Sequence, residues 1–562
     1  MRTLTAVFCL LLGMLLHLGV ASGDILLVPD QYDTIQDAVD AAVYGDEILV
    51  AAGTYSDPTH PAGAGDTTRC CVILKSGITL TGAGMGETII DADSSARAIY
   101  LYQADDVKIR HLTVTGGFAE VYGAGIYCKQ SSPDIRYVEA VENYDGGITM
   151  TSGSNPTIVF CTTHDNEAKA GGGLDVGLGC EPYVYRCSIY NNDAPFAAGV
   201  RLRGSGILEG CTINGNQTTG AVNVLGGGVL VIDTAAPTII HCEIRDNTCY
   251  GDGGGICFMG EGTGGLLEDC EITGNAGTGM ETRGGGIAIG SQANVQIVDC
   301  LIADNYTTGE WSDGGGLWAQ YSSLAMENCT FYGNWTEGNP EYGAGNAGNA
   351  GFETSIYIPG TIDVTHCIFA GSPDGKGVYC TNEEEPPSIG CCDVHGNEGG
   401  DDICGIGGQD NFSQDPEFCD IGAGNFHVLP DSPCAPYHHP GGFGTCDNLL
   451  IGAFTAGCES EVEYPVSEIG GSVALLGNQP NPFTRSTIIS FQLPGSEQVS
   501  LDVFDPSGRR IAILKRGTLP AGIHNVAWDG LTSTRERAAS GIYFYQLTIG
   551  ERVWGRRMLR LR

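Results

Sequence analysis

A phrase of alternating apolar and polar positions recurs along the middle of this chain. It reads Cys-x-[Ile/Phe]-x-x-Asn, as in the copies Cys187 to Asn192 and Cys211 to Asn216. The Cys and the apolar residue two places later lie on one face of a strand, because strand side chains alternate with a period of two. We expect the Asn to end the strand in a left-handed conformation and to stack amide on amide with its neighbours. Further copies begin at Cys161, Cys242, Cys270, Cys300, Cys329 and Cys367, the last with Ser372 in place of Asn.

A glycine run follows the copies in the same register, as in Gly226-Gly227-Gly228 and Gly253-Gly254-Gly255, and a new apolar strand begins after it. The recurring cysteines are 24 to 38 residues apart, which is too long for a hexapeptide coil, and no helix-forming stretch lies between them. The pattern predicts an all-β fold, a three-sided parallel β-helix solenoid of roughly a dozen coils. Each coil supplies one such Cys, so we expect these thiols to be unpaired, buried fillers of the core.

The ends of a solenoid need covers. Thr34 can cap a short helix whose apolar face is Ile35, Ala38 and Val39, directly before the strand 47–50. The stretch from Val28-Pro29-Asp30 to Tyr55, the coil from Val107 to Gly117, and the motifs Asp415-Pro416, Phe426-His427-Val428 and Ile451 to Phe454 resemble the right-handed β-helix (pectin-lyase-like) superfamily. The resemblance implies a right-handed parallel β-helix over residues 24–458.

The character of the chain changes after Cys458. Residues 459–476 are polar and predict a linker, and short alternating strands separated by turn signals then predict a small β-sandwich over 477–562. Asn478 to Phe483, Val503 to Arg509, Ser540 to Tyr545 and the ending Arg557 to Arg562 resemble two related modules. These are the Ig-like domain of the flagellar hook-capping family and the C-terminal sorting domain of type IX secretion. The resemblance implies a module that contacts secretion or attachment machinery.

The first residues indicate export. Arg2 precedes the apolar run Val7 to Val20, and Ala21-Ser22-Gly23 offers small residues for cleavage, so residues 1–23 predict a secretory signal peptide. No later segment predicts a membrane span. We therefore expect an extracellular protein or one held on the outer cell surface.

Charge narrows the choice of partners. The chain carries a net charge of −40, and from Ser467 onward 12 basic and 7 acidic residues give +5, which leaves −45 for residues 1–466. Such a surface argues against nucleic-acid binding. Calcium remains open as a ligand of some carboxylates, although no EF-hand or nonapeptide repeat is present. The late cysteines, from Cys380 to Cys458, contain no CxxC pair, so no metal site is predicted and disulfides are permitted.

Two observations weigh against catalysis. The paired carboxylates Asp105-Asp106 and Asp401-Asp402 lack the Gly-His-Gly and Arg-Ile-Lys companions of the polygalacturonase-type hydrolases of the superfamily. Arg201 and Arg203 place two basic groups on one strand face, which we interpret as a solvated surface.

The loops between each Asn and the next glycine run hold the candidate site. They lengthen along the chain and gather aromatic and acidic residues, which could stack on sugar rings and hydrogen-bond to their hydroxyls. Packing among the loops themselves is the alternative interpretation. The candidate ligand-binding residues are Tyr250, Tyr306, Glu310, Trp311, Asp313, Trp335, Glu337, Glu341 and Tyr342.

Two functions follow. The leading hypothesis is a non-catalytic, exported surface protein whose β-helix presents a face that binds a polysaccharide, a surface glycan or another partner, without a cofactor. The rival is a polysaccharide lyase or glycoside hydrolase of the pectin-lyase-like superfamily. Two carboxylates facing each other at about 5–10 Å would favour the rival.

Overall fold

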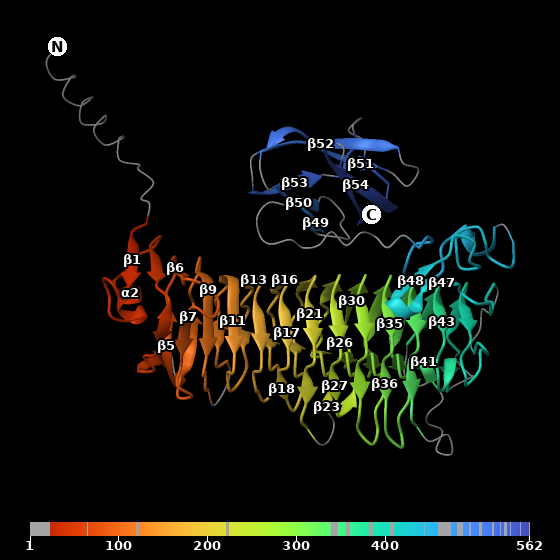
Figure 1. Ribbon diagram of the computed structural model, residues 1–562, viewed down its shortest axis with the longest axis horizontal. Coiled ribbons are helices and arrows are strands. Elements are labelled where there is room, and N and C mark those ends of the chain that lie inside the picture. Colours follow the sequence, from red (N-terminus) through yellow and green to blue (C-terminus); the bar gives the residue numbers. More distant parts are fainter. Residues whose placement is uncertain are drawn as a thin grey trace, which may run out of the picture. The chain divides into compact units, whose positions relative to one another are not determined.

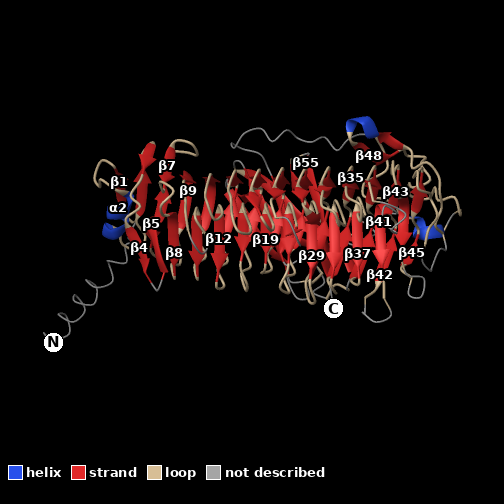
Figure 2. Ribbon diagram, turned by 90° about the horizontal axis from the view of Figure 1, so that it is seen from below, coloured by secondary structure: helices blue, strands red, loops and turns tan. Residues whose placement is uncertain are grey.

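The structure is a computed structural model of the chain. It divides into two compact units, Met1–Ser460 and Glu461–Arg562, and both are built almost entirely of strands, as the sequence predicted. Within the described part of the chain, helices occur only near the two ends of the first unit (Figure 2). The described residues are 23–63, 66–119, 123–220, 224–338, 347–355, 360–381, 386–404, 410–442, 444–458, 474–479, 487–493, 496–504, 509–519, 522–528, 530–532, 537–539, 541–550 and 552–560.

The first unit is a solenoid of about 12 turns (Figure 1). One long sheet receives two short strands from most coils, which meet at a corner. Its strands are β1 (Ile25–Val28), β2 (Glu47–Val50), β3 (Gly53–Tyr55), β6 (Thr79–Thr81), β7 (Thr88–Asp91), β9 (Lys108–Thr115), β11 (Asp134–Val141), β13 (Thr157–Val159), β14 (Thr162–His164), β16 (Tyr183–Tyr185), β17 (Ser188–Tyr190), β20 (Ile207–Glu209), β21 (Thr212–Asn214), β25 (Thr238–Ile240), β26 (Glu243–Arg245), β30 (Gly264–Glu268), β31 (Glu271–Thr273), β34 (Asn294–Val298), β35 (Leu301–Ala303), β38 (Ser323–Glu327), β39 (Thr330–Tyr332), β42 (Ile362–Thr365), β43 (Ile368–Ala370), β45 (Ser388–Gly390) and β46 (Asp393–His395).

A 13-stranded sheet forms the opposite side of the coils. Its strands are β4 (His60–Gly63), β5 (Asp66–Leu74), β8 (Arg97–Tyr102), β10 (Ile126–Lys129), β12 (Ile148–Thr151), β15 (Leu174–Val176), β19 (Val200–Leu202), β24 (Val229–Val231), β29 (Ile256–Met259), β33 (Ile287–Gly290), β37 (Leu317–Gln320), β41 (Ala347–Glu353) and β44 (Lys376–Cys380). Between the two large sheets, two-residue strands form a six-stranded sheet: β18 (Asp193–Ala194), β22 (Gln217–Thr218), β27 (Thr248–Cys249), β32 (Ala276–Gly277), β36 (Tyr306–Thr307) and β40 (Trp335–Thr336). A two-stranded sheet, β23 (Val224–Leu225) with β28 (Gly251–Asp252), lies in the loops that follow.

Equivalent residues of successive coils lie side by side. Ile256 pairs with Ile287, and Ile287 pairs with Leu317, in parallel register. These three side chains are fully buried and belong to one continuous core that runs from Leu26 to Val394. Burial of apolar surface, at about 25 cal/mol per Å², therefore couples each coil to its two neighbours.

The recurring cysteines lie at the corner of the long sheet. The residue before each one is left-handed, as with Arg186 at φ 48° and Asp269 at φ 51°. The thiol that follows points inward, and Cys187 Sγ donates to the Ile158 carbonyl of the previous coil at 3.6 Å. The ladder thiols are buried and unpaired, which confirms their predicted role as core fillers.

The asparagines form the predicted amide ladder. Asn247 Nδ2 donates to Asn275 Oδ1 at 3.0 Å, and Asn275 Nδ2 donates to Asn305 Oδ1 at 2.9 Å. The expected left-handed conformation belongs instead to the residue before the Asn of each repeat, such as Gly274 at φ 64°. The reason is geometric: the chain turns one residue early so that the Asn side chain can point inward. The ladder comprises Asn143, Asn166, Asn192, Asn216, Asn247, Asn275, Asn305, Asn334, Asn349 and Asn397.

A helix covers the first coil, as predicted. Helix α2 (Ile35–Ala41) begins after Thr34, whose hydroxyl accepts a hydrogen bond from the Asp37 amide at 3.0 Å. Its apolar side chains Ile35, Ala38 and Val39 are buried against the first coils. The open edge of the apolar core is thereby closed at this end.

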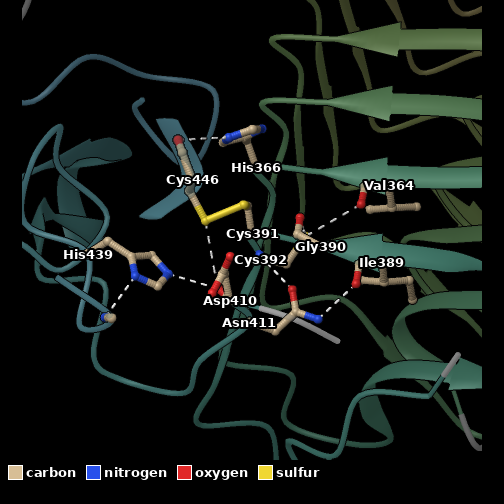
Figure 3. The surroundings of a disulfide bond; sticks show 11 residues. Val364, His366, Ile389, Gly390, Cys391, Cys392, Asp410, Asn411, His439 and Cys446 are labelled. Atoms are coloured by element: carbon tan, nitrogen blue, oxygen red, sulfur yellow. Dashed lines mark hydrogen bonds between the residues drawn. A yellow bond between two sulfur atoms is a disulfide. The ribbon is translucent and has the colours of Figure 1, made fainter. Parts of the chain in front are cut away.

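The other end is held by disulfides, which are Cys380–Cys404, Cys391–Cys446 and Cys419–Cys458. Figure 3 shows how Cys391 at the last corner is bonded to Cys446, in the short helix η3 (Thr445–Asn448). Beside this bond, Asn411 accepts from the Cys392 amide at 2.9 Å and donates to the Ile389 carbonyl at 2.9 Å. Two other late cysteines, Cys392 and Cys434, are buried free thiols.

The segment after the last coil folds back over the outside of the long sheet. It contains β47 (Phe418–Asp420), the short helix η2 (Ile421–Ala423) and β48 (Asn425–Val428). Phe418 and Phe426 pack around Tyr332, and the Ala453 amide donates to Thr330 Oγ1 at 3.0 Å.

The second unit is a β-sandwich with its own core around Phe491, Leu501, Trp528 and Tyr545. One sheet has the order β49 (Ala474–Gln479), β50 (Thr487–Leu493), β53 (Gly522–Trp528). The other has the order β52 (Arg510–Leu519), β51 (Glu497–Phe504), β54 (Gly541–Ile549), β55 (Arg552–Arg560). The predicted linker falls mostly outside the described residues.

Candidate functional site

Three large apolar side chains are exposed on loops of successive coils. Tyr250 follows β27 and is 46% exposed, Met280 follows β32 and is 68% exposed, and Trp311 follows β36 and is 41% exposed. The Trp311 amide donates to the Met280 carbonyl at 3.0 Å, which fixes these two loops side by side. The Thr278 amide donates to the Cys249 carbonyl at 2.8 Å, which fixes the loops of Tyr250 and Met280 side by side as well. We call Tyr250, Met280 and Trp311 the loop row.

Acidic side chains surround the loop row. Glu281 and Glu310 are chain neighbours of Met280 and Trp311, and both are exposed, as is Glu337 on the next coil. Their carboxylates can accept hydrogen bonds from hydroxyl groups of a ligand lying on the row. Glu341 and Tyr342, the last two candidates from the sequence, lie outside the described residues.

The rings of Tyr306 and Trp335 stack on each other. They pair across β36 and β40, with ring centroids 4.7 Å apart and an interplanar angle of 3°. Both side chains are half-buried. The pair packs one loop onto the next, so the faces in contact are not available to a sugar ring.

Asp313 points into the turn instead of outward. Its side chain is 4% exposed, and Oδ1 accepts hydrogen bonds from the Gly314 amide at 3.0 Å and the Ala347 amide at 2.6 Å. The carboxylate therefore holds two turns together. Of the sequence-derived candidates, the structure leaves Tyr250, Glu310, Trp311 and Glu337 exposed on this side of the solenoid.

The outer face of the 13-stranded sheet carries a second group of residues, which the repeat pattern does not reveal as a site. Tyr100, Tyr127, Thr149, Asp175 and Arg201 occupy one register row on five successive strands. Arg201 donates two hydrogen bonds to Asp175, from Nε to Oδ1 at 2.8 Å and from Nη2 to Oδ2 at 2.6 Å. The expectation that Arg201 lies on a solvated face is wrong, because this bidentate pair holds the side chain down at 17% exposure.

At the start of this row, an arginine is almost fully buried. Arg97 is 1% exposed, donates to Asp66 Oδ2 at 2.8 Å and to the Gly123 carbonyl at 2.9 Å, and lies over the Tyr127 ring at 4.9 Å. The Tyr100 hydroxyl is buried and has no hydrogen-bond partner among the described residues. A buried hydroxyl without a partner is costly, and a ligand oxygen could supply one.

Asp145 and Lys169 complete this group. Burial raises the pKa of Asp145, and the nearby Lys169 and Arg97 partly offset that rise, whereas Asp175 adds to it. We call Arg97, Tyr100, Tyr127, Asp145, Lys169, Asp175 and Arg201 the charged row. One signal could have revealed part of it: the second residue after the glycine run is charged in two consecutive repeats, at Asp175 and Arg201, where later repeats have Leu230, Cys257 and Ala288.

Metal ligands are not gathered at either surface. Among the residues that the structure describes, no group of three or more His, Cys, Asp or Glu side chains is arranged to hold a metal ion. In the same residues, no helix is long and apolar enough to cross a membrane. The predicted signal peptide falls almost wholly outside the described residues.

The sequence matches the family model described as right handed beta helix region over residues 97–243, 186–356 and 227–415, which together cover more than half of the chain. The chain belongs to the right-handed beta-helix family. Residues 477–551 match the model of the FlgD Ig-like domain, which confirms the Ig-like fold of the second unit.

Curated and solved relatives are more distant. Mannuronan C5-epimerase AlgE4 of Azotobacter vinelandii is 35% identical over 99 residues, which make up 16% of this chain and 17% of the epimerase. The chain thus spans about a sixth of that relative. The AlgE4 A-module structure, from the same organism, is 20% identical with a TM-score of 0.37, covering 67% of this chain and 91% of the module. Pectate lyase Pel9A is 14% identical with a TM-score of 0.33, covering 78% of this chain and 98% of the lyase. Neither structural likeness is close enough to transfer a function.

Proposed function

We propose that this is an exported, surface-held protein that binds a polysaccharide along its β-helix without cleaving it. The observation that carries the proposal is the loop row. Three adjacent coils expose Tyr250, Met280 and Trp311 side by side, and soluble proteins rarely leave such side chains together in water unless they bind something.

The geometry suits a carbohydrate chain. Aromatic side chains bind the apolar faces of sugar rings, and carboxylates accept hydrogen bonds from their hydroxyls. Parallel coils repeat about every 4.8 Å, so a chain lying along the solenoid would meet an equivalent loop at each step. Met280, between the two aromatic residues, adapts its shape to the ligand.

Glycan-array binding by the purified mature protein, followed by calorimetry with the retained glycan, tests the proposal. We expect Tyr250→Ala and Trp311→Ala each to weaken binding by about tenfold, or about 1.4 kcal/mol. Leu178→Ala, which removes an equally exposed apolar side chain elsewhere, is the control. Retention of no glycan, or unchanged affinity in both aromatic variants, would contradict the proposal.

The charged row supports a second candidate, a polysaccharide lyase or related enzyme. Proton abstraction beside a uronate carboxylate needs a base, an acid and cations. Asp145, with its raised pKa, the buried Tyr100 hydroxyl and the Lys169 ammonium are groups of those kinds. The limited identity to an epimerase also favours this candidate. Turnover of alginate or pectate that disappears in Tyr100→Phe would establish it; absence of turnover on these uronates would leave the binding function.

For the C-terminal unit we propose a role in secretion or surface attachment. The final strand, β55, carries several arginines, but not all of them are available to a partner, because Arg560 is 5% exposed. The exposed basic side chains of the described residues include Arg510, Lys515 and Arg516 on β52, which pairs only with β51 and is therefore an edge strand. Such an edge can attract an acidic partner. A chain ending at Gly471 should keep its β-helix but lose surface retention in the native host; equally efficient retention would leave the unit a purely structural role.

A further inference from the structure

A separate pocket lies where helix α2 meets the first coils. It has a volume of about 220 Å³ and lies between the start of α2, the end of β3 and strands β5 and β7. A volume of this size corresponds to about seven water molecules in the liquid, which suits one ring-sized group. None of its lining residues belongs to the loop row or the charged row.

The pocket has an apolar floor and one aromatic wall. Ile35, Val72 and Ile90 form the floor, and all three are buried. Tyr55 is half-buried at the side, and its hydroxyl donates to the Ala51 carbonyl at 3.1 Å. Cys71 also reaches the floor, but burial raises the pKa of its thiol to about 11, so the thiol stays neutral and is a poor nucleophile. The pocket is therefore built for binding and not for thiol chemistry.

The rim is polar and negative. Asp57 accepts a hydrogen bond from the Thr59 hydroxyl at 2.6 Å and lies 3.0 Å from His60 Nε2. The Thr59 hydrogen bond lowers the pKa of Asp57, so its carboxylate is charged at neutral pH. Asp33, Thr54 and Ser56 also line the pocket, and within the part of the chain that the structure describes their side chains make no hydrogen bond or ion pair. They are free to bind a ligand.

More carboxylates act on the same space. Asp30 is close enough to Tyr55 to add to the rise that burial causes in the pKa of its hydroxyl. Asp91 and Asp93 act in the same way on the Cys71 thiol at the floor. Among the residues that the structure describes, no Lys or Arg lines the pocket. Its potential is negative, which attracts cations and repels anions.

We propose that this pocket binds a single hydroxylated ammonium ligand, of the size and chemistry of an amino sugar. The ammonium group pairs with the Asp57 and Asp33 carboxylates, and its charge is attracted to the Tyr55 ring. The hydroxyls bind Thr54 and Ser56, and the apolar face of the ring lies on Ile35 and Val72. A uronate is excluded by repulsion, and an apolar ligand would leave the carboxylates without partners.

Three sugars of the same size separate the effect of ligand charge from the effect of ligand shape. Glucosamine, glucose and glucuronate carry a positive, a zero and a negative charge, so their affinities report the potential of the pocket at constant shape. The full mature chain is titrated with each sugar and binding is monitored by NMR, at a pH at which the amine is protonated. We expect glucosamine to bind most tightly, glucose less tightly and glucuronate least tightly. The preference for glucosamine should shrink as salt is added.

Variants locate the binding. Asp57→Asn keeps the shape of the side chain and should weaken glucosamine binding by about tenfold while leaving glucose unchanged. Tyr55→Leu should weaken both sugars. Glu181→Gln removes one exposed carboxylate elsewhere and should change neither, and unchanged thermal midpoints show that the variants are folded. The proposal is overturned if glucuronate binds as tightly as glucosamine, if glucosamine does not bind, or if Glu181→Gln has the effect of Asp57→Asn. None of these outcomes bears on the loop row, whose test uses other residues and polymeric glycans.

Discussion

Asn397 donates from Nδ2 to Asp401 Oδ1 at 2.8 Å, so the amide ladder of the solenoid ends on a carboxylate. In every bond between two ladder side chains, the Nδ2 of one Asn donates to the Oδ1 of the next one toward the C-terminal end, and the carboxylate receives the last donor of that series. Asp401 also accepts from the Asn397 and Gly396 amides, both at 2.9 Å. Asp401, which the sequence offered with Asp402 as a pair of carboxylates, thus serves to end the amide ladder.

Asp401→Asn should destabilise the last coils at neutral pH by about 1–3 kcal/mol, because a charged acceptor of three hydrogen bonds is lost. Partial burial alone would raise the pKa of Asp401, but the hydrogen bonds from Asn397 and Gly396 outweigh burial and lower it. A carboxyl whose pKa is lower in the folded than in the unfolded state stabilises the fold at pH values above its unfolded-state pKa, which is near 4. This stability is lost as the pH falls through the folded-state pKa. The difference between wild type and variant in hydrogen exchange of these coils should therefore vanish in acid. A difference that persists there would contradict the assignment.

Asn275→Ala should cost about 3 kcal/mol or more in the free energy of unfolding. The substitution removes the donor to the Ile244 carbonyl and the acceptor of the Asn247 backbone amide, and it leaves Asn305 Oδ1 with only the backbone amide of residue 275 as a donor from that coil. All of these groups are buried, so their lost hydrogen bonds are costly. Asn294→Ala removes an exposed asparagine from a strand of the same unit and serves as the control. Denaturant titration of the two variants gives the comparison. Equal effects would mean that the ladder adds nothing beyond ordinary strand packing.

Asp393 should make the C-terminal end of the solenoid less stable as the pH rises. Burial raises the pKa of Asp393 to about 7, although the Gln414 amide and the Cys434 thiol both donate to it. A folded-state pKa above the unfolded value gives stability that is complete below about pH 4 and is lost as the pH rises through 7. Over that window the loss is on the order of 4 kcal/mol.

Asp393→Asn should remove this dependence, and Asp402→Asn, at an exposed neighbouring position, should not. Denaturant titrations at a series of pH values between 4 and 8 measure it. The idea fails if the wild type and Asp393→Asn show the same slope of stability with pH.

The buried free thiols of the first unit should resist alkylation in the native protein. The described residues contain 16 free cysteines, and all are buried. Burial removes access to all of them, and for Cys128 and Cys257 it also raises the pKa, which removes the reactive thiolate. Iodoacetamide followed by mass spectrometry should label these 16 only after denaturation, and label the six bonded cysteines only after reduction as well. Rapid labelling of the native chain would show that coils open far more often than the packing implies.

Local demands explain why the coil could be predicted. A corner needs a small inward side chain, and a strand end needs a side-chain amide that can form hydrogen bonds to both the preceding and the following coil. Cys and Asn therefore recur with the period of the fold. The same logic explains the substitution at Ser372: the ladder passes through Asn349, supplied by an earlier segment, whose Nδ2 donates to Asn397 Oδ1 at 2.8 Å.

The sites could be predicted only in part. Tyr250 and Trp311 were found because exposed aromatic residues accumulate in lengthening loops, but Asp313 is held inward by amides of its own and the next coil, which composition does not reveal. Asp175 and Arg201 pair across 26 residues, and each separately has the appearance of an ordinary surface charge. The pocket beside α2 joins residues from four elements, and its shape exists only after they pack.

The uniform direction of the amide ladder has an evolutionary consequence. In each ladder step, as from Asn247 to Asn275, the side-chain and backbone amides of one Asn both donate to the Oδ1 of the next coil, and its own Oδ1 accepts from the previous coil. These bonds make no demand on coils farther away. A duplicated or deleted copy of the whole repeat would therefore leave every remaining amide with a partner. The length of this protein is free to drift in steps of one coil, and the reach of any surface built on its loops can change with it, while the two closed ends stay the same.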